Sequence, residues 1–203
     1  GFKALAAHAR YISRQGKEEV GGSGRTLEVT DELGQKHEGT EAVRQLMEDW
    51  RTSGSYIPDD SHRKEAFNII FSMPKETRPE ALEAAVADTA AQLFEGHRYA
   101  MVMHRDQGAP HVHVMVRAER SDGRRLNPRK ADLDRWRATF ARQLQARGID
   151  AVATRQVARL RNRVHPSIWE IKAKGEGRLN RDRGSVKSSP AAQKARAEAL
   201  RAW

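Results

Sequence analysis

Three histidines and an aspartate lie within ten residues of one another in this chain, where two apolar runs meet. Residues 98–103 (RYAMVM) and 111–118 (HVHVMVRA) both have the composition and length of β-strands. Residues 105–110, which separate them, contain Asp, Gly and Pro and are typical of a reversing turn. The sequence therefore predicts an antiparallel hairpin, and any fold of this chain must place these two strands side by side.

The histidines of this hairpin are expected to converge. Alternate side chains of a strand share a face, so His111, His113 and Met115 point one way and the valines between them point the other way. The turn returns His111 to about the level of His104, which brings three imidazoles to one end of the strand pair. Such a set suits a divalent metal ion with open coordination positions. A surface or hydrogen-bonded structural role is the alternative, but the third histidine and the nearby Asp106 favour the metal.

The charge of the chain points to a polyanionic partner. The 203 residues carry 37 Lys and Arg against 27 Asp and Glu, a formal net charge of +10. This surplus favours nucleic acid over an anionic membrane, although a basic surface also keeps proteins in solution. There is no run of eighteen apolar residues and no signal peptide, so we expect no membrane insertion. The absence of cysteine excludes disulfides and thiolate zinc sites, and it is compatible with a cytoplasmic location.

Apolar periodicity predicts four helices and one further strand upstream of residue 150. The predicted helices are 2–14, 40–50 with Thr40 as its N-cap, 79–95 and 130–147. Residues 25–39 suggest a small hairpin or an irregular excursion. Residues 66–73 (AFNIIFSM) predict a strand that is central in its sheet, because it is almost entirely apolar. Helices packed on an antiparallel sheet define the α+β class.

Three motifs of this chain occur in a characteristic order. The segment ARYISRQGK surrounds Tyr11, NIIFSMP contains Ser72, and the histidine hairpin reads His104-x-Asp106-x₃-Pro110-His111-x-His113. These segments resemble the first, second and third signature motifs of conjugative relaxases of the MobA/VirD type, which are HUH-type, single-strand-nicking endonucleases. An LNPRK segment followed by a helix also fits, so the resemblance runs from about Tyr11 to about Arg155.

The resemblance implies an antiparallel sheet flanked by helices, with the histidines on central strands beneath an N-terminal helix that carries the tyrosine. It also implies an enzyme that nicks one strand of a plasmid origin of transfer, stays attached to the 5′ end through a phosphotyrosine and leaves a 3′-OH. Accessory DNA-binding proteins and the coupling protein of a type IV secretion system would be its partners. Such an enzyme works in the bacterial cytoplasm and passes with the DNA into a recipient cell.

The resemblance also assigns roles to residues. Tyr11 would be the nucleophile, and His104, His111 and His113 would hold Mg²⁺ or Mn²⁺ against the scissile phosphate. A phenol with a pKa of about 10 is mostly protonated at neutral pH, so a histidine, an acid or the metal-polarised surroundings must help to remove its proton. His104 is one candidate for this catalytic role. Asp106 is another, either as the proton acceptor or as the group that orients an imidazole.

Residues that flank the motifs or lie in basic loops are candidate DNA contacts, and the resemblance adds Ser72 as a residue that helps to hold the strand. The basic candidates are Arg10, Arg14, Lys17, Arg105, Arg117, Arg124, Arg125, Arg129 and Lys130. Trp50, Trp136 and Trp169 could stack on unpaired bases, but their helical spacing favours core packing.

The sequence departs from the family pattern at two places. Arg117 stands four residues after the last histidine, where the family often has asparagine. The chain also starts at Gly1, directly before the tyrosine helix, whereas relaxases of this type usually have a strand there. We therefore expect a fragment or a processed start. The expected parts are a nicking domain at 1–163 and a basic helical tail at 164–203 that contains a flexible linker at 175–189.

Three other functions are considered. Rolling-circle replication initiators and transposases of the same superfamily typically place the tyrosine after the histidine motif, which disfavours them here. A non-catalytic DNA-binding accessory protein is disfavoured because Tyr11, Asp106 and the three histidines are all present. A metal hydrolase of small molecules finds no support in the basic charge.

Overall fold

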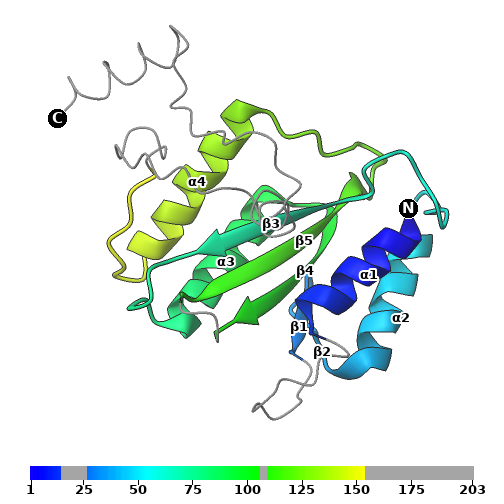
Figure 1. Ribbon diagram of the computed structural model, residues 1–203. Helices are drawn as coiled ribbons and strands as arrows, with labels where there is room; N and C mark the ends of the chain where they lie inside the picture. Colours follow the sequence, from blue (N-terminus) through cyan, green and yellow to red (C-terminus); the bar gives the residue numbers. More distant parts are fainter. Residues whose placement is uncertain (15–26, 106–108, 154–203) are drawn as a thin grey trace, which may run out of the picture. The chain divides into compact units, whose positions relative to one another are not determined.

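The sheet that carries the histidines is built from five antiparallel strands. The computed structural model describes residues 1–14, 27–105 and 109–153, and the statements below concern these residues. The elements in chain order are α1 (Phe2–Ile12), β1 (Val29–Asp31), β2 (Lys36–His37), α2 (Gly39–Thr52), β3 (Ala66–Ser72), α3 (Pro79–Leu93), β4 (His97–His104), β5 (His111–Arg120) and α4 (Lys130–Gln145). The α+β class expected from the sequence is confirmed (Figure 1).

Strands β4 and β5 form the expected hairpin inside the sheet. The strand order is β2-β1-β4-β5-β3, and every neighbouring pair is antiparallel. His104 lies directly opposite His111 in the β4–β5 pair, as the turn predicted. The small hairpin expected near residue 30 is also present, because β1 pairs with β2. The histidines therefore stand on two inner strands, as the resemblance implied.

Alternation along the strands gives the sheet two differently packed faces. On one face, Val102 of β4 and Met115 of β5 belong to a core that also contains side chains of α1 and α2. On the other face, Val112 and Val114 belong to a core formed with α3 and α4 (Figure 1). The three histidines alternate in step with Val102 and Met115, so they lie on the face that α1 and α2 cover.

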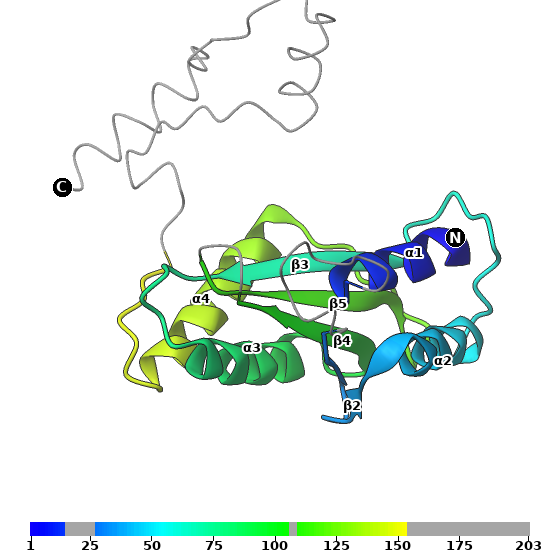
Figure 2. The ribbon, with the colours of Figure 1, turned by 60° about the horizontal axis from the view of Figure 1, so that its bottom comes forward.

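The central position predicted for residues 66–73 is wrong, because β3 lies at an edge of the sheet. Figure 2 shows β3 and β2 at opposite edges. Phe71 is buried on the face of α3 and α4, whereas Ile70 on the other face is 55% exposed. An uninterrupted apolar run predicts burial on both faces. Here only one face of the strand is covered, and the sequence of the strand does not distinguish the two situations.

The four predicted helices are confirmed with small shifts at their ends. α1, α3 and α4 each end two residues before the predicted end. α2 begins at Gly39 after Glu38, so Thr40 is not its N-cap. On α4, Trp136 and Leu144 are buried, whereas Leu133 is 38% exposed.

The expectations for residues 154–203 lie outside the described residues. They comprise the short helices after residue 153, the linker at 175–189 and the domain boundary at residue 163. Among the helices that the structure does describe, none is long and apolar enough to cross a membrane.

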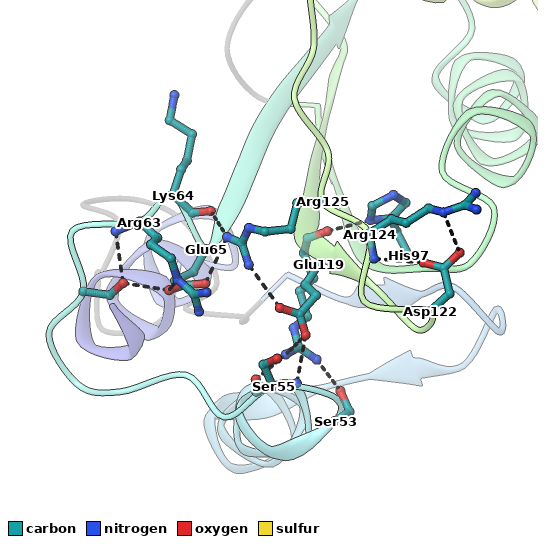
Figure 3. A network of polar contacts seen from close by, with 12 residues as sticks. Ser53, Ser55, Arg63, Lys64, Glu65, His97, Glu119, Asp122, Arg124 and Arg125 are labelled. Carbon is teal, nitrogen blue, oxygen red and sulfur yellow. Dashed lines mark hydrogen bonds and ion pairs between the residues drawn. The ribbon is translucent and has the colours of Figure 1, made fainter.

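A buried network of charges closes the end of the sheet that lies away from the histidines (Figure 3). Arg117 and Glu119 of β5 are only 4% and 7% exposed. The Arg117 guanidinium donates hydrogen bonds to Ser53 Oγ (3.0 Å) and to the Ser55 carbonyl (2.6 Å), both just after α2. Glu119 accepts hydrogen bonds from the Ser55 backbone N–H (2.8 Å) and from Arg125 (3.1 Å). The network thus joins β5 to the loop that leaves α2.

Replacing Glu119 by Gln should destabilise the fold. Burial alone would raise the pKa of Glu119, but the hydrogen bonds from Ser55 and the charges of Arg117 and Arg125 lower it overall, so the carboxylate is charged at neutral pH. Without that charge, Arg117 remains buried with less compensation, and we expect a loss of about 2 kcal/mol in the free energy of unfolding, measured with urea.

Glu41→Gln is the matched control for this measurement. Glu41 forms a comparable bidentate pair with Arg44, but on the exposed surface of α2, where such pairs contribute little. We expect this control to leave stability nearly unchanged. Equal effects of the two substitutions would contradict a stabilising role of the buried network.

Candidate active site

Three imidazoles meet where β4 ends and β5 begins. His104 is the last residue of β4, and His111 and His113 open β5. The ring centroids are 4.9 Å apart for His104 and His111, 4.7 Å for His104 and His113, and 5.3 Å for His111 and His113. One nitrogen of each ring lies within 4.8 Å of the corresponding nitrogens of the other two. The convergence predicted from the sequence is therefore present, and we call these three residues the histidine triad.

Hydrogen bonds to neighbouring groups orient each ring of the triad. Nδ1 of His111 donates to the Ala109 carbonyl (3.1 Å), and Nδ1 of His113 lies 3.4 Å from Oδ1 of Asn68 on β3. Both contacts leave Nε2 of these rings available. Nε2 of His104 donates to the Ile12 carbonyl (2.7 Å), so Nδ1 is the nitrogen of that ring that carries the lone pair, and it lies 3.4 Å from Nη2 of Arg14. Imidazoles held through one nitrogen in this way are the usual ligands of transition and divalent metals.

The electrostatics of the site favour a neutral imidazole at His113. Burial, together with the neighbouring His104, His111, His8 and Arg14, lowers the pKa of His113 to about 4. His113 is 7% exposed, so a charged ring would have little water to solvate it. A neutral imidazole is the form that binds a metal ion. Three neutral nitrogen donors at this spacing fit a divalent cation and leave its full charge for an anionic substrate.

Tyr11 lies beside the triad because α1 ends there. The Tyr11 side chain is 64% exposed, and its ring stacks on His8 one turn earlier, with centroids 6.2 Å apart. The next residue, Ile12, supplies the carbonyl that holds His104. The helix end that carries the expected nucleophile is thus fixed to a ring of the triad by one buried hydrogen bond.

Arg14 and Ser72 also lie at the triad. Arg14 adopts a positive φ of 56°, unusual for a residue other than glycine, and its Nη2 lies 3.4 Å from Nδ1 of His104. Ser72 is exposed and lies directly opposite His111 in the β3–β5 pair. Two expected contributors, Lys17 and Asp106, fall outside the described residues.

Several expected DNA contacts lie away from the triad. Arg117 is six residues beyond His111 on β5, about 20 Å away along an extended strand. Its guanidinium is buried against protein oxygens, so it is unavailable to a phosphate, and we do not retain Arg117 among the DNA contacts. Arg125 binds Glu119 and Glu65 in the same network.

The remaining basic candidates are exposed. Arg105 follows β4 and pairs with Glu80 and Glu83 of α3. Arg10 is exposed on α1, and Arg124 pairs with Asp122 in the turn after β5. Arg129 and Lys130 stand at the start of α4, on the other face of the sheet. Arg14 thus contacts the triad, and Arg10 and Arg105 are the direct sequence neighbours of Tyr11 and His104.

Sequence reasoning missed the three groups that orient the triad, which are the Asn68 side chain and the carbonyls of Ile12 and Ala109. Asn68 is the one polar side chain within the apolar run of β3 before Ser72, which is a visible signal, but its pairing partner depends on the register with β5. The Ile12 carbonyl is a backbone group and leaves no trace in the sequence. Two of the tryptophans weighed as base-stacking residues are buried instead, Trp50 at 0% and Trp136 at 6% exposure, while Trp169 lies beyond the described part.

The lowered pKa of His113 predicts how acid affects stability. The pKa in the folded protein, about 4, is below the ordinary value of about 6.5 of an unfolded chain, so the unfolded chain binds more protons between these values. Stability of the metal-free protein should therefore fall as the pH is lowered from 6.5 toward 5. In His113→Gln this slope should be smaller, which urea unfolding at pH 5.0 and 7.0 would measure. An unchanged slope would contradict the shift.

The triad also predicts binding of a divalent cation. In calorimetric titration with Mn²⁺, we expect the unmodified chain to bind one ion and His113→Ala to show no such binding. Asn68→Leu should weaken binding by about tenfold, because His113 loses its orienting partner. His62→Ala, which removes an exposed imidazole from the loop before β3, is the control and should bind like the parent. Unaltered binding by His113→Ala would rule out the triad as the site.

Comparison with known proteins agrees with this arrangement. A family model described as the MobA/VirD2-like relaxase nuclease domain matches residues 11–149. The T-DNA border endonuclease VirD2 of Rhizobium rhizogenes is 32% identical over 113 residues, which cover 52% of this chain and 25% of that protein. VirD2 of Agrobacterium fabrum is 31% identical over 113 residues, with the same coverage.

The chain thus spans about a quarter of the length of the curated relatives it matches. The family match covers more than half of the chain, and it begins at Tyr11 and includes both strands of the triad. The chain therefore belongs to the MobA/VirD2-like relaxase family, whose nuclease domain it matches.

Proposed function

We propose that this chain nicks one strand of DNA at a plasmid origin of transfer and remains linked to the 5′ end through Tyr11. The observation that carries the proposal is the hydrogen bond between Nε2 of His104 and the Ile12 carbonyl. It holds the helix end that presents Tyr11 against the triad, so that nucleophile and phosphate-binding groups form one site. Membership in a family of DNA-nicking relaxases supports the reaction class.

The choice of Tyr11 also rests on the positions of the other two tyrosines. Tyr99 is 6% exposed and lies on the opposite face of the sheet, where burial raises its pKa and disfavours the phenolate. Tyr56 is exposed in the loop after α2, where its hydroxyl and ring both contact Arg51 of that helix and no contact with the triad is recorded among the described residues. Tyr11 alone of the three stands beside the histidines.

The reaction is a transesterification. The Tyr11 hydroxyl oxygen attacks phosphorus, its proton passes to a local acceptor, and the P–O3′ bond breaks to leave a 3′-OH and a 5′-phosphotyrosine. Asp106 remains the proposed proton acceptor, because both nitrogens of His104 are engaged: Nε2 donates to the Ile12 carbonyl, and Nδ1 faces the metal position and Arg14. A bound divalent cation, Mg²⁺ or Mn²⁺, would supply positive charge to the non-bridging phosphate oxygens. Because the phosphotyrosine keeps the energy of the broken bond, the reverse attack rejoins the strand without a nucleotide cofactor.

The proposed substrate and partners rest on the net charge of the chain and on its similarity to the VirD2 relatives. The net charge of +10 suits single-stranded DNA, with Arg10, Arg14, Arg105 and Ser72 around the site as its contacts. The VirD2 relatives are named as T-DNA border endonucleases. We propose the corresponding role at an origin of transfer, in the bacterial cytoplasm, with accessory DNA-binding proteins and a type IV secretion coupling protein as partners. The nicking domain would comprise residues 1–163.

Tyr11→Phe tests this proposal. Single-stranded oligonucleotides that tile the DNA around the gene would be incubated with the protein and Mn²⁺, and covalent adducts would be resolved on a denaturing gel. The parent should form an adduct with one tile. Tyr11→Phe, which lacks the attacking oxygen, should form it at least about a thousandfold more slowly. Tyr56→Phe is the matched control and should react like the parent. Equal adduct formation by Tyr11→Phe would refute the assignment.

A further inference from the structure

A cavity lies between α1 and the beginning of β3, next to the triad but distinct from it. Its volume is about 290 Å³. Leu5 of α1 and Met115 of β5 form apolar walls, and His8 and Asn68 contribute polar groups. This volume is at the lower end of the range for small-ligand pockets, so it suits one planar group rather than a stack of several.

Both walls of the cavity continue into the candidate active site. On the helix wall, the ring of His8 stacks on Tyr11. On the strand wall, Asn68 contacts His113 through its amide oxygen. Ile70 follows Asn68 on the same face of β3, lies opposite His113 and leaves 55% of its side chain exposed. A strand of DNA whose phosphate lies at the triad therefore has an apolar path along β3 into the cavity.

The polar groups of the cavity fit a nucleobase. Nε2 of His8 is buried and has no hydrogen-bond partner within the described part of the chain. A buried polar atom without a partner costs free energy unless a ligand or water satisfies it. Together with the Asn68 amide, it offers hydrogen bonds to the polar edge of a heteroaromatic ring, while Leu5 and Met115 offer apolar contacts to such a ring.

The entrance of the cavity is basic. Arg63 and Lys64 line it, and both side chains are exposed. Glu65 also lines the cavity, but its carboxylate accepts a hydrogen bond from Ser61 (2.7 Å) and pairs with both Arg63 (3.4 Å) and Arg125 (3.3 Å), so the cations at this position outnumber it. The charge available to a ligand at the entrance is thus positive, as the phosphates on either side of an inserted base require.

We propose that this cavity holds one unstacked base of the DNA strand, within a few nucleotides of the bond that is cut, and so contributes to the choice of nick site. This inference rests on the proposed function, because the proposed nicking reaction defines where the cut bond lies. Loss of the contacts made by one inserted base typically weakens DNA binding by a factor of about 10 to 100.

The test compares two substitutions on α1. Ala4 lines the cavity, whereas Ala7 is exposed on the same helix and lines neither this cavity nor the groove between α1 and α2. Ala4→Phe should fill the cavity, and Ala7→Phe adds the same ring elsewhere. Fluorescence anisotropy in EDTA would measure binding of labelled 12-mers of dA, dC, dG and dT, and of an abasic 12-mer with the same number of phosphates.

For the parent and for Ala7→Phe, we expect at least one base-bearing 12-mer to bind about tenfold or more tightly than the abasic one. In Ala4→Phe this preference should disappear, while affinity for the abasic 12-mer stays the same. Asn68→Leu tests the opposite wall and should also reduce the preference. His8→Phe keeps a ring against Tyr11 but lacks Nε2, so it should change which base is preferred.

Retention of the full preference by both Ala4→Phe and Asn68→Leu, with folding confirmed by circular dichroism, would overturn the inference. This outcome is separable from failure of the proposed function. A Tyr11 adduct without any base preference would refute the proposed base-binding role of the cavity and leave the proposed nicking reaction intact. A base preference that Ala4→Phe abolishes, without a Tyr11 adduct on any tile, would support the cavity and refute the nicking activity.

Discussion

The register of the β4–β5 hairpin is the constraint on which the rest of the structure depends. It places His104 opposite His111 and puts both on the face where Val102 and Met115 pack under α1 and α2. A slip of one residue would turn the β5 histidines toward α3 and α4 and bury imidazoles in an apolar core. At the other end of β5, the buried Arg117 and Glu119 fix the same register through the loop after α2. The buried charges at one end of β5 thus stabilise the strand register that brings the histidines together at the other end.

The second constraint is the link between α1 and the triad. Ile12 is 1% exposed and anchors the helix in the core, while its carbonyl accepts the hydrogen bond from His104. Tyr11, the residue before it, therefore combines a fixed backbone with an exposed side chain. A nucleophile needs this combination, because the reacting oxygen must reach the phosphate while its approach stays restricted. The same geometry places His8 and the cavity beside β3 one turn further back along α1.

Local pattern was enough to predict the hairpin, the alternation of histidines and valines, the four helices and the α+β class. These features depend on side-chain period and on turn residues that are close in sequence. The edge position of β3 and the contact between Asn68 and His113 depend on which strands pair, which one chain segment does not encode. The burial of Arg117 could not be predicted either, because its oxygen partners come from a loop more than sixty residues earlier. Backbone acceptors such as the Ile12 carbonyl are beyond any argument from residue types.

Mass spectrometry of the peptide that is linked to DNA tests the central claim most directly. Trypsin cleaves after Arg10 and Arg14, so the account predicts that the nucleotide mass will be found on the tetrapeptide Tyr11–Arg14, with fragmentation placing the phosphate on the tyrosine. Nucleotide attached to a peptide containing Tyr56 or Tyr99, or to a histidine of the triad, would contradict it.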